Sequence, residues 1–219
     1  MSTPSIEVFG LTVSEPATVL TNWIFASFCL LFGHKLFHNH SDKYQKNWSF
    51  YFLLIGLASI TGGTAHGFFT YFGQNLHLVS WLFIGIGVYG SELATSYILP
   101  DGNSRKRFRT FSLIKLVIFF SSLIYFQSFE VVRINTAMGL VGMVLPIHLL
   151  DFMKNKRQGS KTVVLAVIAM LAPAAVHAFR ISYNDWFNHN DISHLVMILS
   201  FYVFYLGADK AGSLSRTPA

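Results

Sequence analysis

The chain has 219 residues, of which 53% are hydrophobic and only 12% are charged, and its mean hydropathy is +0.48. A soluble domain carries about 25% charged residues, so this composition excludes an ordinary water-soluble domain and indicates a protein embedded in lipid. The single cysteine, Cys29, excludes both a disulfide framework and a thiolate metal cluster.

Seven apolar segments recur along the chain, separated by polar breaks. A bilayer core about 30 Å thick requires about 20 apolar residues in each helix that crosses it. The segments predict helices over residues 17–38, 48–72, 77–99, 111–128, 131–150, 162–181 and 191–208. Glu15-Pro16 predicts the start of the first helix, and Pro173 predicts a kink in the sixth. No repeat or long linker interrupts the pattern, so we expect an all-α, polytopic bundle of seven transmembrane helices forming one domain over residues 1–219.

Basic residues concentrate in every second loop, which predicts the orientation in the membrane. They are Lys35, Lys43 and Lys46 after the first helix, Arg105, Lys106, Arg107 and Arg109 after the third, and Lys154, Lys156, Arg157 and Lys161 after the fifth. By the positive-inside rule these loops face the cytoplasm, so the N-terminus is expected outside and the C-terminus inside. Contacts to anionic lipids explain the net charge of +6, so we expect membrane lipids as partners. A nucleic-acid partner is not needed to explain this charge.

The nine histidines divide into two groups by their predicted depth. Those expected toward the outer face are His66, His77, His177, His189 and His194. Those expected toward the inner face are His34, His38, His40 and His148, and we interpret this second group as contacts to lipid headgroups. Polar side chains at membrane depth tend to face the bundle interior, so several outer imidazoles could meet around a zinc ion, whose bound water acts as a nucleophile near neutral pH. The alternative is that these histidines cap helices or hydrogen-bond across the bundle.

Two short stretches contain histidines near predicted helix ends: Ser59 to His66 late in the second predicted helix, and Asn190 to His194 at the start of the seventh. They resemble the histidine motif late in helix two and the His-x-x-x-His motif in helix seven of the CREST superfamily of seven-helix membrane proteins, which includes alkaline ceramidases and the adiponectin and progestin receptors. The seven-helix layout covers nearly the whole chain, whereas the motifs match only in part. The resemblance implies three zinc-binding histidines and, in the enzymes of the family, hydrolysis of lipid amides.

The chain departs from the family motifs at three positions. Gly62 stands in place of the serine four residues before His66, Asn190 in place of the first helix-seven histidine, and His77 near the position of the family's aspartate. A rebuilt zinc site would use His66, His77 and His194. Further candidates for ligands or supporting groups are Asn190, His189 and His177.

We therefore expect a zinc-dependent membrane hydrolase that acts on a lipid amide or ester. The alternatives are a lipid-binding receptor or sensor of the same fold without catalysis, and a haem- or proton-handling membrane protein. One further residue is notable because it lies within the third predicted helix: an unpaired carboxylate at Glu92 would be costly there, so we expect it to be protonated or paired.

Overall fold

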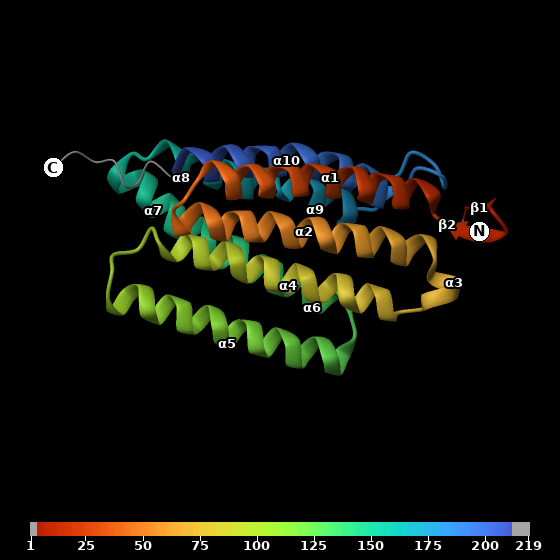
Figure 1. Cartoon of the computed structure of the whole chain (residues 1–219), viewed down its shortest axis with the longest axis horizontal. Coiled ribbons are helices and arrows are strands. Elements are labelled where there is room, and N and C mark those ends of the chain that lie inside the picture. Colours follow the sequence, from red (N-terminus) through yellow and green to blue (C-terminus); the bar gives the residue numbers. More distant parts are fainter. Residues whose placement is uncertain (1–3, 212–219) are drawn as a thin grey trace.

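The structure, a computed structural model, describes residues 4–211 and is almost entirely helical (Figure 1). The elements in chain order are β1 (Ser5–Val8), β2 (Leu11–Ser14), α1 (Pro16–Asn39), α2 (Lys43–Gly67), α3 (Phe69–Phe72), α4 (Asn75–Ser96), α5 (Asn103–Phe126), α6 (Phe129–Gly139), the π-helix η1 (Leu140–Val144), α7 (Leu145–Asn155), α8 (Gln158–Ala169), α9 (Leu171–Ala178) and α10 (His189–Ala211). In the described part of the chain, seven helical segments are long and apolar enough to cross a membrane. The predicted all-α fold, with seven helices able to cross a membrane by length and composition, is confirmed at this level.

Two of these seven segments are built from several pieces. The segment over Phe129–Asn155 consists of α6, η1 and α7, and the segment over Gln158–Ala178 consists of α8 and α9. The helical pattern breaks at Met170, between α8 and α9. Pro173 follows in the first turn of α9, where its missing N–H cannot bond the carbonyl of Ala169, so the break predicted for this segment lies one turn before the proline.

The helix ends differ from the predicted ones because a hydropathy window detects apolar residues and not caps. α5 begins at Asn103, eight residues before the predicted start, and its first two turns carry the basic residues of the predicted loop. α2 begins at Lys43, where the Asp42 side chain accepts a hydrogen bond from Gln45 N at 3.1 Å. α2 also ends at Gly67, and the short α3 follows it, where one continuous helix to residue 72 was predicted.

A two-stranded hairpin precedes the first helix and was not predicted. β1 and β2 pair antiparallel with Ile6 opposite Val13 and Val8 opposite Leu11. Phe9 and Gly10 form the two-residue turn and both have positive φ, as a type I′ turn requires. The hairpin is held to α3 by the backbone N–H of Thr12, which donates to Tyr71 Oη at 3.0 Å.

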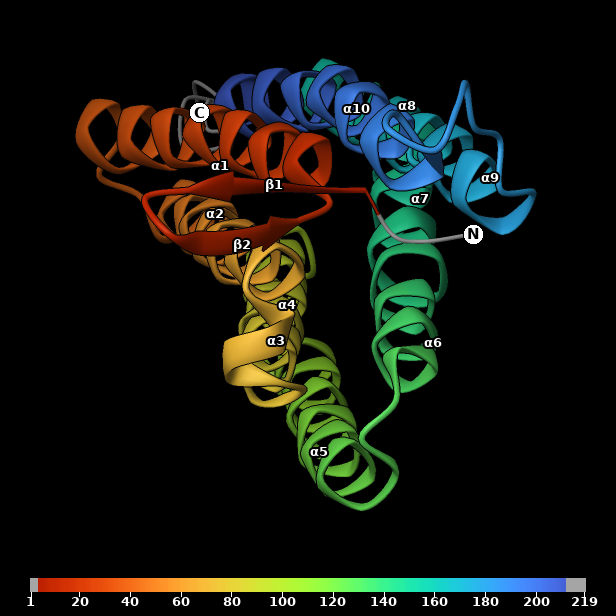
Figure 2. The same ribbon diagram turned by 90° about the vertical axis from the view of Figure 1, so that its right-hand side faces the viewer.

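The helices form an elongated bundle with two distinct ends (Figure 1). The hairpin end carries β1, β2, α3 and the loop between α9 and α10, and the opposite, basic end carries the α1–α2, α4–α5 and α7–α8 connections. Seen from the hairpin end, α1, α2, α4 and α5 follow one another across the bundle, and α6 returns the chain toward α8 and α10 (Figure 2). α10 packs against both α8 and α1, so the first and last helices are neighbours.

Aromatic side chains fill the core where α1, α2 and α10 meet. Phe25 lies edge-on to Phe201 with ring centroids 4.8 Å apart, and Tyr51 stacks on Phe201 at 5.7 Å. Trp48 and Phe204 are fully buried beside them. Such rings combine a large buried area with specific edge and face contacts, so they fix how these three helices pack and hence the position of the polar groups at the hairpin end.

Candidate functional site

The hairpin end gathers five histidines from four helices. They are His66 on α2, His77 on α4, His177 on α9, and His189 and His194 on α10. All five are partly buried. The rings of His66 and His77 lie 4.9 Å apart, and those of His177 and His189 lie 5.1 Å apart. The structure therefore places the five predicted outer histidines at one end of the bundle, as two close pairs and a fifth residue.

The first pair is joined to the N-terminal segment by Glu15. Glu15 directly precedes α1 in a left-handed conformation, and its Oε2 lies 2.5 Å from His66 Nδ1. The hydrogen bond from His66 lowers the pKa of Glu15; burial opposes the shift, and the nearby His66, His189 and His77 add to it when charged. The contact therefore stabilises the fold above the pKa that Glu15 has in the unfolded chain, and this stabilisation is lost as pH falls through the lower pKa of the folded state.

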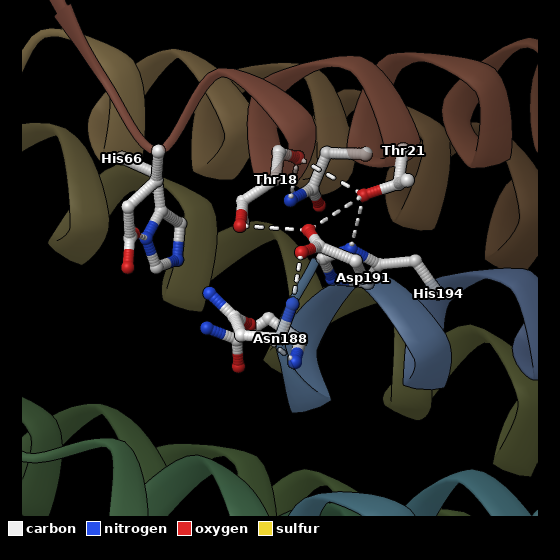
Figure 3. Close-up of polar contacts among 9 residues, drawn as sticks. Thr18, Thr21, His66, Asn188, Asp191 and His194 are labelled. Carbon is white, nitrogen blue, oxygen red and sulfur yellow. Dashed lines mark hydrogen bonds and ion pairs between the residues drawn. The ribbon is translucent and has the colours of Figure 1, made fainter. Parts of the chain in front are cut away.

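Asp191 is the centre of a second polar network, drawn in Figure 3. Its side chain is fully buried, and its Oδ1 accepts hydrogen bonds from Thr18 Oγ1 at 2.8 Å and Thr21 Oγ1 at 3.4 Å. Its Oδ2 accepts from the backbone N–H of Asn188 at 2.7 Å, while Asn188 Oδ1 accepts from the N–H of Asn190. This is a capping box at the start of α10. The same carboxylate thus caps α10 and connects it to the first turns of α1.

His194 belongs to the Asp191 network and not to the His66 pair. Its Nδ1 lies 3.1 Å from Thr21 Oγ1, the same hydroxyl that reaches Asp191. Figure 3 shows His66 to one side, outside the hydrogen bonds around Asp191. Predicted depth and the motif resemblance group His66, His77 and His194, and the structure brings only the first two into ring contact.

The side chains at the hairpin end are of types that bind zinc, but they are not arranged around one common position. Two imidazoles and a carboxylate occur together in Glu15, His66 and His77, and this is a donor combination that zinc accepts. However, within residues 4–211 no three histidine, cysteine, aspartate or glutamate side chains are arranged to hold a metal ion. The side chains in their present arrangement therefore do not fit a zinc site, and the zinc hypothesis stays a prediction.

A chain of aromatic and imidazole rings crosses the same end of the bundle. It runs from His77 to Trp81 on α4 at 5.9 Å, to Phe129 on α6 at 5.8 Å, and to His177 on α9 at 6.2 Å. His189 continues it onto α10. Sequence analysis did not anticipate Phe129 here, because nothing in its local pattern shows that it lies between Trp81 and His177.

The remaining predicted candidates, Asn190 and His189, accompany His177. The side chain of Asn190 lies near the His177 ring, and the ring of His189 lies 5.1 Å from it with the two planes tilted by 53°. His189 and His194 point in different directions from α10: His194 toward Thr21 on α1, and His189 toward His177 on α9. This agrees with the spacing expected on a helix, where residues five apart lie on different faces.

Glu92 is paired, as expected for a carboxylate within the bundle. Its fully buried side chain lies 2.9 Å from Lys115 Nζ on α5, and Lys115 also donates to Asn135 Oδ1 on α6 at 2.5 Å. Removing one member of such a pair leaves an uncompensated charge in a low-dielectric setting. The three residues join α4, α5 and α6 away from the hairpin end, and we assign them to packing of the bundle.

His148 does not contact headgroups, contrary to the prediction. It is fully buried, with Nδ1 3.2 Å from Ser160 Oγ and Nε2 3.4 Å from Thr95 Oγ1. Ser160 donates its proton to Asp151, which also pairs with Arg157. Because the serine bonds the aspartate and is itself buried, these residues form a structural network between α4, α7 and α8. The prediction placed His148 by depth alone, and depth does not show which way a side chain points.

Comparisons with known proteins assign the chain to a family but do not indicate an activity. A comparison with curated proteins finds no match. The matching family profile runs from residue 17 to residue 213, from the start of α1 to just beyond α10, and so covers all seven segments that are long and apolar enough to cross a membrane. On this match the chain belongs to DUF6962, a family of unknown function.

Proposed function

We propose that this protein is a multi-pass membrane receptor or sensor that binds a lipid-derived ligand at the hairpin end and carries out no chemistry on it. The observation that carries the proposal is the ring chain of His77, Trp81, Phe129, His177 and His189. It places hydrogen-bonding imidazoles next to apolar aromatic faces. A ligand with a polar end and an apolar body matches this combination.

The polar end of the ligand would meet imidazoles that have no carboxylate partner. Of the five histidines, only His66 pairs with an acidic side chain among the described residues. His77 and His177 are half-buried. Each ring therefore has an exposed part that a ligand can contact, and a ligand bound there would be partly shielded from water. The ring chain crosses α4, α6, α9 and α10, so occupancy would affect how four helices pack, which is the coupling that a sensor requires.

We also propose that the hairpin end faces outside. The support is the segregation of lysine and arginine to the opposite end, where the α1–α2, α4–α5 and α7–α8 connections carry most of the cations. A ligand from the external medium or the outer leaflet would then reach the ring chain directly.

The experiment is an inventory of lipids bound to the purified protein by mass spectrometry. We expect one lipid species to co-purify at about one per chain, and we expect a His77→Gln/His177→Gln variant to lose it. The matched control is His34→Gln/His38→Gln at the basic end, where two adjacent histidines with rings 4.2 Å apart are changed in the same way. Equal retention or equal loss in both variants would count against the proposed site.

A zinc-dependent hydrolase related to the CREST superfamily is the second candidate, favoured by the close approach of Glu15, His66 and His77. These residues would have to rearrange to take up a metal, so we derive no reaction step from them. Elemental analysis of the same samples separates the candidates. One zinc per chain that His66→Ala and His77→Ala both abolish, and that His34→Ala leaves intact, would place the hydrolase first.

A further inference from the structure

The first two turns of α5, at the basic end of the bundle, carry four cations within five residues: Arg105, Lys106, Arg107 and Arg109. Arg105 forms an ion pair with Asp101. In the described part of the chain, no acidic side chain pairs with the other three. The positive end of the helix dipole lies at the same place, because α5 begins at Asn103 without a side-chain cap.

Two open grooves flank this turn of α5 and share one border. The first, of about 500 Å³, lies between α4 and α5 and is lined by Arg109, Tyr89 and Leu113 among others. The second, of about 420 Å³, is an open depression along the surface of α5 alone and is lined by Arg107, Phe111 and Ile114 among others. Lys106 and Thr110 belong to both grooves, so they form the border between them.

The guanidinium of Arg109 in the first groove is held in place before any ligand arrives. Arg109 Nε donates to Ser96 Oγ at 2.8 Å, and its guanidinium lies 4.5 Å from the centre of the Tyr97 ring. Arg105 donates to the carbonyls of Ser96 and Leu99 and so ties α5 to the end of α4. A fixed arginine loses little conformational entropy on binding an anion.

Both grooves lead from these cations toward apolar surface. Leu113 is 50% exposed in the first groove, and Phe111 and Ile114 are 53% and 52% exposed in the second. They belong to α5, which packs mainly on α4 and α6 and leaves one face uncovered. A soluble phosphate would contact only the charged end of such a surface, whereas a phospholipid would contact both ends.

We propose that an anionic diacyl phospholipid binds astride Lys106 and Thr110, with one acyl chain in each groove. Its phosphate lies at the shared border and contacts Lys106, Arg107 and the fixed Arg109, while Thr110 Oγ1 supplies a hydroxyl donor. The acyl chains follow Leu113 on one side and Ile114 on the other. Basic pockets between membrane helices are known to bind anionic headgroups, and here the paired grooves add a reason to select a lipid with two chains.

The test is native mass spectrometry of the full-length protein in detergent, titrated with phosphatidylglycerol. At about 1 kcal/mol for each surface cation, a Lys106→Gln/Arg107→Gln variant should bind about thirtyfold more weakly. Both side chains are exposed and unpaired with acids, so we expect this variant to fold. The matched control is Lys154→Gln/Lys156→Gln, two exposed lysines at the same end of the bundle, and it should bind as the wild type does.

Three further ligands test the identity of the occupant. Phosphatidylcholine, which carries no net charge, and lyso-phosphatidylglycerol, which has one chain, should each bind the wild type more weakly than phosphatidylglycerol. Millimolar inorganic phosphate should not compete. A Thr110→Trp variant, which fills the border without removing a charge, should also lose binding. Each of three results would overturn the proposal. They are an equal loss of phosphatidylglycerol binding in the Lys106→Gln/Arg107→Gln and Lys154→Gln/Lys156→Gln variants, equal binding of the three lipids by the wild type, and displacement of phosphatidylglycerol by inorganic phosphate.

Discussion

At the scale of single residues, Asp191 shows how a charge is accommodated inside this bundle. Its carboxylate is fully buried, yet each oxygen has a donor: Thr18 and Thr21 on α1 for Oδ1, and the N–H of Asn188 for Oδ2. Its role in capping α10 could be predicted from the sequence, since it lies in the first turn of the last apolar segment. Its bonds to α1 could not, because Thr18 is 173 residues away and no local pattern relates the two.

Replacing Asp191 tests whether this carboxylate joins the first and last helices. Asp191→Ala leaves buried donors on Thr18, Thr21 and Asn188 without an acceptor, and an unsatisfied buried group costs about 1–3 kcal/mol. We expect a clear fall in the thermal midpoint of the purified protein in detergent. Asp185→Ala, in the exposed α9–α10 loop, should leave the midpoint unchanged. If the two variants unfold alike, the Asp191 network does not contribute to stability.

At the scale of elements, the approach of α4 to α6 depends on a missing side chain at Gly139. A Cβ there would lie 2.6 Å from Glu92 Oε1 and even closer to Val88 Cγ1. The π-helix η1 begins at the next residue, so the backbone leaves regular α-helical geometry where the buried Glu92–Lys115 pair must fit. The glycine thus makes room for the ion pair between α4 and α5.

Two glycines three residues apart provide a matched test of this contact. Gly139→Ala should destabilise the protein by about 1–3 kcal/mol, because overpacking forces Val88 and Glu92 to move. Gly142→Ala should be neutral or stabilising by up to about 1 kcal/mol, since among the described residues no atom beyond its chain neighbours and its own helix backbone lies within 4 Å of its Cβ position, and alanine favours helix. Unfolding by sodium dodecyl sulfate measures both variants. Equal stability would show that α4 and α6 do not pack as described.

The sequence predicts the number and type of the helices well, because the apolar length needed to cross a bilayer is a strong signal. It predicts their ends poorly, as α5 shows, because seven of its first eight residues are polar or charged yet helical, Phe108 being the exception. The hairpin had a readable signal in the alternation of Ile6, Val8, Leu11 and Val13 around Phe9-Gly10, a pattern typical of two paired strands. The ring chain had none, because its residues come from four separate helices.

At the scale of the whole molecule, the charges divide the bundle into two unlike ends. The hairpin end joins histidines to Glu15 and Asp191, and the opposite end carries the cationic turn of α5 and the basic α7–α8 connection. The two lipid proposals follow this division: a ligand recognised by imidazoles and aromatic rings at one end, and an anionic phospholipid recognised by lysine and arginine at the other. Both depend on the bundle lying across a membrane with its ends in different compartments.

Cysteine labelling in intact cells tests that arrangement. In a background with the buried Cys29 replaced by serine, single cysteines at Asn75 and at Tyr183, which is 83% exposed, should react with a membrane-impermeant maleimide because the hairpin end faces outside. Cysteines at Asn103 and Lys154, both exposed at the basic end, should react only after the membrane is permeabilised. The reverse pattern would invert the orientation and place the imidazole site in the cytoplasm. Reaction at all four positions in intact cells would contradict a bundle that spans the membrane and would remove the basis for assigning the two ends to different lipid leaflets.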